Sequence, residues 1–227
     1  REFCERGHVL EPMHPLVLGY HALLEYEQGE FSEGEAYVKQ LIEAMRLVPP
    51  GPNFHSSVAA LVIPIVARIT GSADHLDTAD ASAQAVLSST SATPNVTNLA
   101  RIGATLLAVH RGDVDGATLL YSALKEHHYA EPLHLEHLLG LLAQVMGKLD
   151  DAEGHFEEAL AFYRKSGYRP ELAWAFRDYA DALLQRDGTG DRSKALSLLD
   201  ESLSISQELG MRPLTERVVA ARDNLQA

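Results

Sequence analysis

The chain has 227 residues, 46% of them hydrophobic, and its 19 Lys and Arg against 32 Asp and Glu give a formal net charge of -13. This negative charge argues against direct nucleic-acid binding and against docking on anionic membranes, because both need a basic surface. The single cysteine, Cys4, excludes an intrachain disulfide and fits a reducing compartment, so we expect a cytoplasmic protein.

Helical periodicity and turn signals alternate along the whole chain. We expect residues 1–13 to be a lead-in and residues 14–227 to form one domain of helices. The expected helices span 15–28, 31–48, 55–70, 74–87, 98–111, 114–127, 171–186, 191–209 and 214–225, with one further pair between 134 and 170. Pro64 should kink the third helix or mark its true start. Residues 88–97 read as a loop, and the glycosylation sequon within it, at 95–97, is set aside because the protein is expected in the cytoplasm.

The clearest structural unit is the stretch His134–Pro170. Small residues at Gly140, Ala152 and Ala159 would let two antiparallel helices approach closely, and Phe156 would fill the space between neighbouring pairs. This spacing is similar to that of a tetratricopeptide repeat (TPR) helix pair. A lone pair leaves apolar faces in water, so the unit needs stacked copies.

Copies of this unit are marked by a recurring glycine. Gly147 should end the first helix in a left-handed conformation, and Asp150 should cap the next helix. Gly29, Gly112 and Gly190 stand at the corresponding positions of other copies. The prediction is therefore an all-α fold, a right-handed TPR-like α-solenoid of about five helix pairs with a C-terminal capping helix.

Catalytic and metal-binding patterns are weak in this sequence. It has no phosphate-binding glycine loop and no recognisable nucleophile set, so we predict no enzyme activity and no cofactor. The histidines at 127, 128, 134 and 137 lie close together, but we interpret them as polar side chains on a helix face rather than a metal site. The acidic groups at 25–35 and 150–158 are interpreted as solvated helix faces.

The first helix of each pair in a TPR stack lines a concave groove, which makes its polar and aromatic side chains candidates for binding. The candidate groove residues are His110, His134, His137, Gln144, Trp174, Arg177 and Asp181. Trp174, Arg177 and Asp181 follow one stripe of a helix. A Trp face, a guanidinium fork and nearby histidines suit an anionic or aromatic group.

A wider resemblance covers most of the chain. The run from Arg169 to Val218, together with LEYEQGEF, RLVPPGP and LVIPIVARITG, resembles the TPR region of large bacterial signalling ATPases. These include LuxR-type transcriptional regulators and NTPase-linked adenylate/guanylate cyclases. The resemblance implies a sensing or scaffold arm that binds a protein or peptide partner, or other domains of its parent chain.

Two other functions stay open at this level. A small effector molecule could sit between Arg177, Trp174 and the histidines, or the array could serve to form a homo-oligomer of the parent. The opening Arg1-Glu2-Phe3, without an initiator Met, leads us to expect a fragment of a larger protein.

Overall fold

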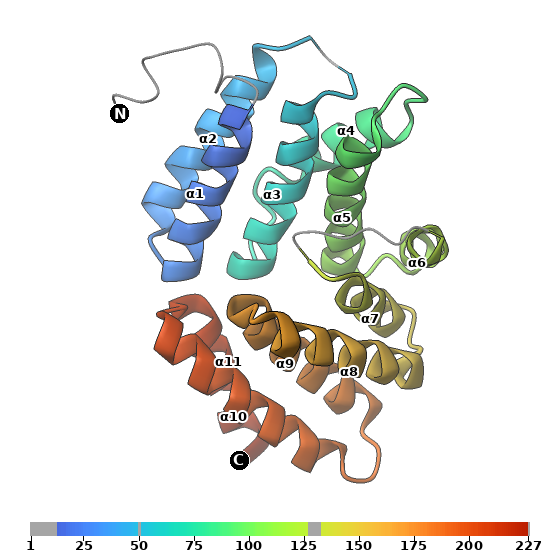
Figure 1. Cartoon of the computed structure of the whole chain (residues 1–227). Helices are drawn as coiled ribbons and strands as arrows, with labels where there is room; N and C mark the ends of the chain where they lie inside the picture. Colours follow the sequence, from blue (N-terminus) through green and yellow to red (C-terminus); the bar gives the residue numbers. More distant parts are fainter. Residues whose placement is uncertain (1–12, 50, 127–132, 227) are drawn as a thin grey trace. The chain divides into compact units, whose positions relative to one another are not determined.

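The computed structural model describes residues 13–49, 51–126 and 133–226, and the described residues form eleven α-helices and no strand. Short turns join most neighbouring helices, which fold back on one another as antiparallel pairs (Figure 1). The all-α prediction is confirmed. The helices are α1 (His14–Gln28), α2 (Phe31–Arg46), α3 (Phe54–Thr70), α4 (Leu76–Leu87), α5 (Pro94–Arg111), α6 (Val114–Lys125), α7 (Leu135–Val145), α8 (Leu149–Ser166), α9 (Arg169–Arg186), α10 (Asp191–Leu209) and α11 (Arg212–Gln226).

Most helix limits agree with the sequence pattern within two or three residues, and the main exception is α5. This helix begins at Pro94, so the end of the expected loop and the sequon at 95–97 form its first turn. Proline suits that position because its missing N–H would have no helical partner there. Pro64 lies inside α3, which starts ten residues earlier at Phe54 with Asn53 as its cap, so Pro64 does not mark a helix start.

The expected cap of α8 is wrong. Lys148 holds the N-cap position without a side-chain hydrogen bond, and Asp150 lies in the first turn of the helix. A carboxylate in the first turn still stabilises the positive end of the helix dipole.

The recurring glycines behave as predicted. Gly29, Gly112, Gly147 and Gly190 have φ angles of 78°, 62°, 71° and 88°, all in the left-handed region. Each follows the first helix of a pair and precedes the second. The repeat read from the sequence is therefore visible in the backbone.

The chain divides into two compact units. Unit 1 comprises Arg1–Tyr26 and Glu30–Leu107, and unit 2 comprises Glu27–Gly29 and Ala108–Ala227. The single domain expected over residues 14–227 stays a prediction, and the lead-in expected at 1–13 lies outside the described residues except for Met13.

Alternate helices of unit 1 pack directly against each other. A Cβ added to Gly19 on α1 would lie 2.7 Å from the Val62 side chain of α3, and one added to Gly103 on α5 would lie 1.9 Å from the Ala60 oxygen of α3. The first helices of three successive pairs therefore approach closely. This is the stacking that a TPR-like solenoid requires.

Unit 2 repeats this arrangement. The odd-numbered helices contact one another, with His137 of α7 bonded to Asp178 of α9 and Arg217 of α11 near Trp174 of α9. The even-numbered helices form a second row in which α6, α8 and α10 share polar contacts. As the capping prediction requires, α11 packs on α10 and buries apolar side chains.

The central repeat unit is packed as its sequence predicts. Phe156 is fully buried, as are Ala152 and Ala159. A Cβ added to Gly140 would lie 3.0 Å from the Phe156 ring, so α7 and α8 approach closely only because Gly140 lacks a side chain. None of the described helices is long and apolar enough to cross a membrane.

Candidate functional site

The predicted groove residues all belong to unit 2 and lie on or next to three helices, α5, α7 and α9. His110 lies in the last turn of α5, and His134 is the N-cap of α7. His137 and Gln144 lie on α7, and the remaining three residues lie on α9: Trp174, Arg177 and Asp181.

His137 is buried between helices rather than placed in a groove. Its ring is 0% exposed, its Nε2 lies 3.0 Å from Asp178 Oδ2, and its Nδ1 lies 3.2 Å from the Tyr163 hydroxyl. With Nε2–H donating to the Asp178 carboxylate, Nδ1 accepts from the Tyr163 O–H. The hydroxyl of Tyr163 accepts a bond from the His134 backbone N–H at 2.9 Å. The expectation that His137 is a polar surface histidine is therefore wrong, because its side chain points between α7, α8 and α9.

A chain of charges leads from this buried pair to the surface. Arg177 Nη1 donates to Asp178 Oδ1 at 3.3 Å, and Arg177 Nη2 pairs with Asp181 Oδ2 at 2.8 Å. The side chains of Arg177 and Asp181 are 28% and 30% exposed, so solvent reaches the Arg177–Asp181 end of this series of ion pairs. The Nε of Arg177 is buried and has no hydrogen-bond partner among the described residues. The part of this guanidinium that a partner can reach is therefore the exposed end, where Nη2 pairs with Asp181.

The electrostatics of Asp181 are unusual. Burial raises its pKa to about 6, while the charges of Arg177 and Arg217 oppose the rise and that of Asp178 adds to it. A carboxyl group that titrates this close to neutrality, beside two cations, is typical of a functional site.

Trp174 and Arg217 lie next to this chain of charges. The guanidinium carbon of Arg217 lies 5.9 Å from the centre of the Trp174 ring, near the outer limit of a cation–π contact. Trp174 is only 1% exposed, which corrects the expectation that its face lines an open groove. Arg217 is absent from the sequence-based set, because its helix reads only as a cap and no pattern relates it to α9.

The remaining predicted residues lie outside the contacts that join His137 to Asp181. His110 is exposed in the last turn of α5, and Gln144 is half-buried near the end of α7. The His134 ring stacks on Phe162 with centroids 3.9 Å apart, and burial lowers the pKa of His134.

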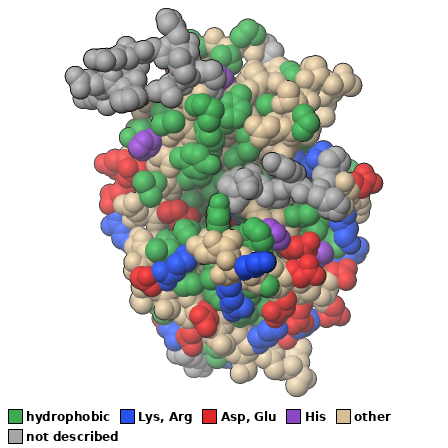
Figure 2. All heavy atoms as spheres, viewed as in Figure 1, with side chains coloured by type: hydrophobic (Ala, Val, Ile, Leu, Met, Phe, Trp, Pro, Cys, Tyr) green, Lys and Arg blue, Asp and Glu red, His purple; other side chains and the backbone are tan. Residues whose placement is uncertain are grey.

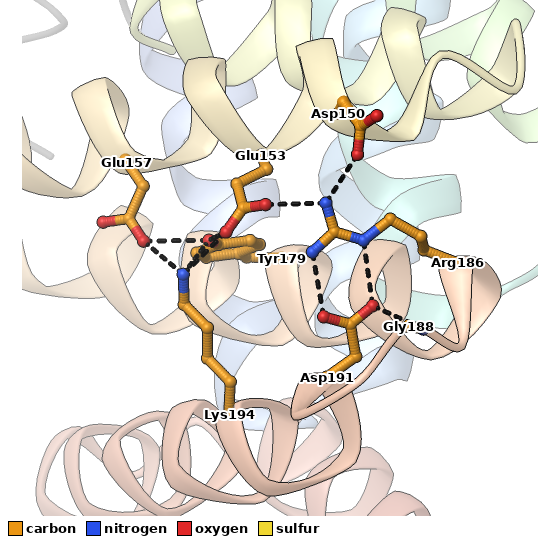
Figure 3. A network of polar contacts seen from close by, with 8 residues as sticks. All are labelled: Asp150, Glu153, Glu157, Tyr179, Arg186, Gly188, Asp191 and Lys194. Carbon is orange, nitrogen blue, oxygen red and sulfur yellow. Dashed lines mark hydrogen bonds and ion pairs between the residues drawn. The ribbon is translucent and has the colours of Figure 1, made fainter.

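A second polar network joins α8, α9 and α10 (Figure 3). Lys194 Nζ lies 2.8 Å from Glu153 and 2.7 Å from Glu157. The Tyr179 hydroxyl lies 2.8 Å from each of the two carboxylates and donates its single proton to one of them. Lys194 and the Tyr179 hydroxyl are also directly paired. Hydrogen bonds from Lys194, then Arg186 and Tyr179, lower the pKa of Glu153 to about 2.

Arg186 extends this network to the turn before α10. Its guanidinium pairs with Asp150 at 2.8 Å, with Glu153 at 2.7 Å and with Asp191 at 2.8 Å. The expectation that the acidic group at 150–158 is only a solvated face is corrected here. Three of its carboxylates instead link helices, because the stacking of α8, α9 and α10 brings cations to them. Elsewhere on unit 2, charged side chains of both signs are interspersed on the face shown in Figure 2.

Metal binding finds no geometric support in the described part of the chain, where no group of three His, Cys, Asp or Glu side chains could hold an ion. The histidines at 127 and 128, which the sequence groups with His134 and His137, lie outside the described residues.

Comparison with known families supports the repeat assignment. Residues 131–208, which include α7 to α10, match the tetratricopeptide repeat family. No curated protein and no solved structure matches the chain. The chain therefore carries a TPR region over these residues, the class of repeat that generally mediates protein–protein interaction.

Proposed function

We propose that this chain is a non-enzymatic interaction domain that recognises an anionic group of a protein or peptide partner. The surface that we assign to this role is the arginine patch, defined as Arg177, Asp181 and Arg217. The observation that carries the proposal is the Arg177 guanidinium, 28% exposed, whose Nη2 is held, among the described residues, only by Asp181, a side chain that is itself 30% exposed. The TPR match over residues 131–208 supports the class of function.

The chemistry of the arginine patch favours a carboxylate. A guanidinium offers a planar fork that binds carboxylates through two parallel hydrogen bonds. In the structure Asp181 occupies one arm of Arg177, so a partner carboxylate would compete with Asp181 for that arm. Protonation of Asp181, with its pKa near 6, removes that competitor. Binding of an anionic partner should therefore strengthen as the pH falls through 6.

A labelled glutamate-rich peptide with a free carboxyl terminus, read by fluorescence anisotropy, tests this role. Arg177→Ala and Arg217→Ala should each weaken binding about tenfold, as expected for loss of a charge-assisted bond. Lys165→Ala is the matched control, because it removes one positive charge from an exposed position on α8. A glutamine version of the peptide should bind poorly to every variant.

One result would contradict this assignment. If Arg177→Ala and Arg217→Ala fold normally and bind the acidic peptide as the unmodified chain does, the arginine patch is not the recognition surface. Pull-down from native cytoplasm with the same variants extends the test to unknown protein partners. The net charge of -13 opposes anion binding, so we expect modest affinity.

We also propose that the chain belongs to a larger bacterial signalling ATPase of the cytoplasm and contacts other domains of that parent. The resemblance of residues 169–218 and the single cysteine support this reading. The complete reading frame of the gene tests this proposal. The frame should encode an ATPase module and, beside that module, a cyclase or DNA-binding module. A frame that encodes neither would contradict the proposal.

Oligomerisation is a second candidate function because α1 has an exposed apolar stripe. Val17, Tyr20 and Leu24, spaced i, i+3 and i+7, are each about half exposed. A second copy of the chain could cover this stripe with its own α1. Light scattering over a concentration series should then show a dimer that Tyr20→Glu abolishes and Leu119→Glu, at an exposed site on α6, does not. A monomer at every concentration would rule this function out.

A further inference from the structure

Unit 1 contains a cavity of about 430 Å³. It lies where the end of α1, the first turns of α2 and the end of α3 meet the segment before α4. Its apolar wall includes Val38, Ile63, Val66 and Ala67. A volume of this size is in the range of sites that hold small organic molecules.

The polar edge of the cavity is centred on Glu35. Its Oε2 accepts a hydrogen bond from the Tyr26 hydroxyl at 3.1 Å, and its Oε1 lies 3.1 Å from His75 Nε2. Burial alone would favour the neutral acid, but the bonds from His75 and Tyr26 outweigh it and lower the pKa of Glu35. Glu35 is therefore a carboxylate at neutral pH.

His75 reaches Glu35 from an uncommon backbone conformation. It has a φ of 61° and a ψ of 5°, in the left-handed region, which is uncommon for residues other than Gly although His, Asn and Asp occur there more often than the rest. It occupies the N-cap position of α4, but its side chain does not cap the helix and instead faces Glu35. Strain of this kind persists where the surrounding structure holds it in place, and it is concentrated at ligand sites.

The charge of the cavity is negative. Two carboxylates line it, Glu35 and Asp74, and none of its described lining residues is a Lys or Arg. Lys39 approaches Glu35 at 3.4 Å from outside, but its side chain is largely exposed. The rings of Tyr26 and Phe31, with centroids 6.0 Å apart and tilted by 41°, add electron-rich faces at the same place. Carboxylates and aromatic faces together attract a cation.

We propose that this cavity of unit 1 binds a small organic cation, with the apolar body against Val38, Ile63, Val66 and Ala67 and the ammonium group at Glu35. An ammonium carries three donors, so it can bond to Glu35 Oε1 in place of His75. The Tyr26 and Phe31 rings then pack beside the charged end. This site is independent of the arginine patch, which lies in unit 2 and suits an anion.

The test uses three ligands of nearly equal shape in isothermal titration calorimetry: 2-phenylethylamine, 2-phenylethanol and 3-phenylpropanoate. The amine should bind at least about tenfold more tightly than the neutral alcohol, and the carboxylate should bind least. Glu35→Gln should remove most of the preference for the amine over the alcohol. Glu43→Gln, which removes the same charge from an exposed position on α2, should leave it unchanged.

A variant that fills the cavity separates the apolar recess from the charge. Val66→Phe should weaken all three ligands about equally, provided that circular dichroism shows an unchanged helical spectrum. Asp74→Asn gives a second charge variant if Glu35→Gln fails to fold. Equal affinity for the amine and the alcohol, an amine affinity that neither charge variant alters, or no amine binding at millimolar concentration would each overturn the proposal.

Discussion

Gly103 on α5 lies directly against the backbone carbonyl of Ala60 on α3, so that a Cβ on Gly103 would fall 1.9 Å from that oxygen. The Ala60 carbonyl is the one that Pro64, four residues later in α3, leaves without its usual helical donor. The two helices of unit 1 therefore meet where one lacks a side chain and the other has a carbonyl outside the helical hydrogen-bond pattern.

Gly103→Ala should destabilise the protein by about 2 kcal/mol or more, because backbone atoms must shift to admit the methyl group. Denaturant melts of the two proteins measure the change. Gly154→Ala is the matched control, since Gly154 lies inside α8 with open space around it and a φ outside the left-handed region. That substitution should instead stabilise by about 0.5–1 kcal/mol through helix propensity. Equal effects of the two changes would contradict the close approach of α3 and α5.

Phe156→Ala should cost about 3–5 kcal/mol, because it empties a fully buried site. The ring stacks on Tyr179 at a centroid distance of 5.5 Å and packs against Gly140, so neighbouring helices cannot easily fill the space. Phe162→Ala makes the same change on the same helix at a ring that is 42% exposed, and it should cost about 1 kcal/mol. A loss below about 1 kcal/mol for Phe156→Ala would show that the repeat register is wrong.

Glu153→Gln should destabilise the fold by about 1–2 kcal/mol near neutral pH, after allowance for a side chain that is 31% exposed. The pKa of Glu153 is lowered from 4.5 to about 2 in the folded state. Its contribution to stability is therefore complete above the unfolded value and disappears as the pH falls from 4.5 to 2. Thermal melts over this range should show the difference between the two proteins vanish. Glu158→Gln, on an exposed part of α8, should show little difference at any pH.

Asp181→Asn should have the opposite dependence on pH. The folded pKa of Asp181 is raised from 3.8 to about 6, so the folded state binds more protons in that window and loses stability as the pH rises through it. The asparagine variant lacks this loss. Its stability relative to the unmodified chain should increase by about 1–2 kcal/mol between about pH 4 and pH 7. Asp151→Asn, at an exposed site on α8, provides the control, and a flat difference for Asp181→Asn would contradict the raised pKa.

Local signals in the sequence are sufficient for much of the fold. The apolar periodicity locates the helices, and the glycines at 29, 112, 147 and 190 locate turns because a positive φ is easiest for a residue without a side chain. The burial of Phe156 follows from its place in the repeat. The start of α5 is misjudged because Pro94 and its polar neighbours are compatible with a loop and with a first helical turn.

The identity of the polar sites depends instead on the tertiary structure. His137 and Asp178 are 41 residues apart, as are Glu153 and Lys194, and only the stacking of helices brings each pair together. The same stacking buries Trp174 and brings the Arg217 guanidinium of α11 near the Trp174 ring. In unit 1, no local sequence pattern predicts the cavity at Glu35 or the left-handed backbone of His75. Periodicity determines which face of a helix is apolar. The partners of a polar side chain depend instead on the distance and rotation between packed helices, and the local sequence pattern does not encode these.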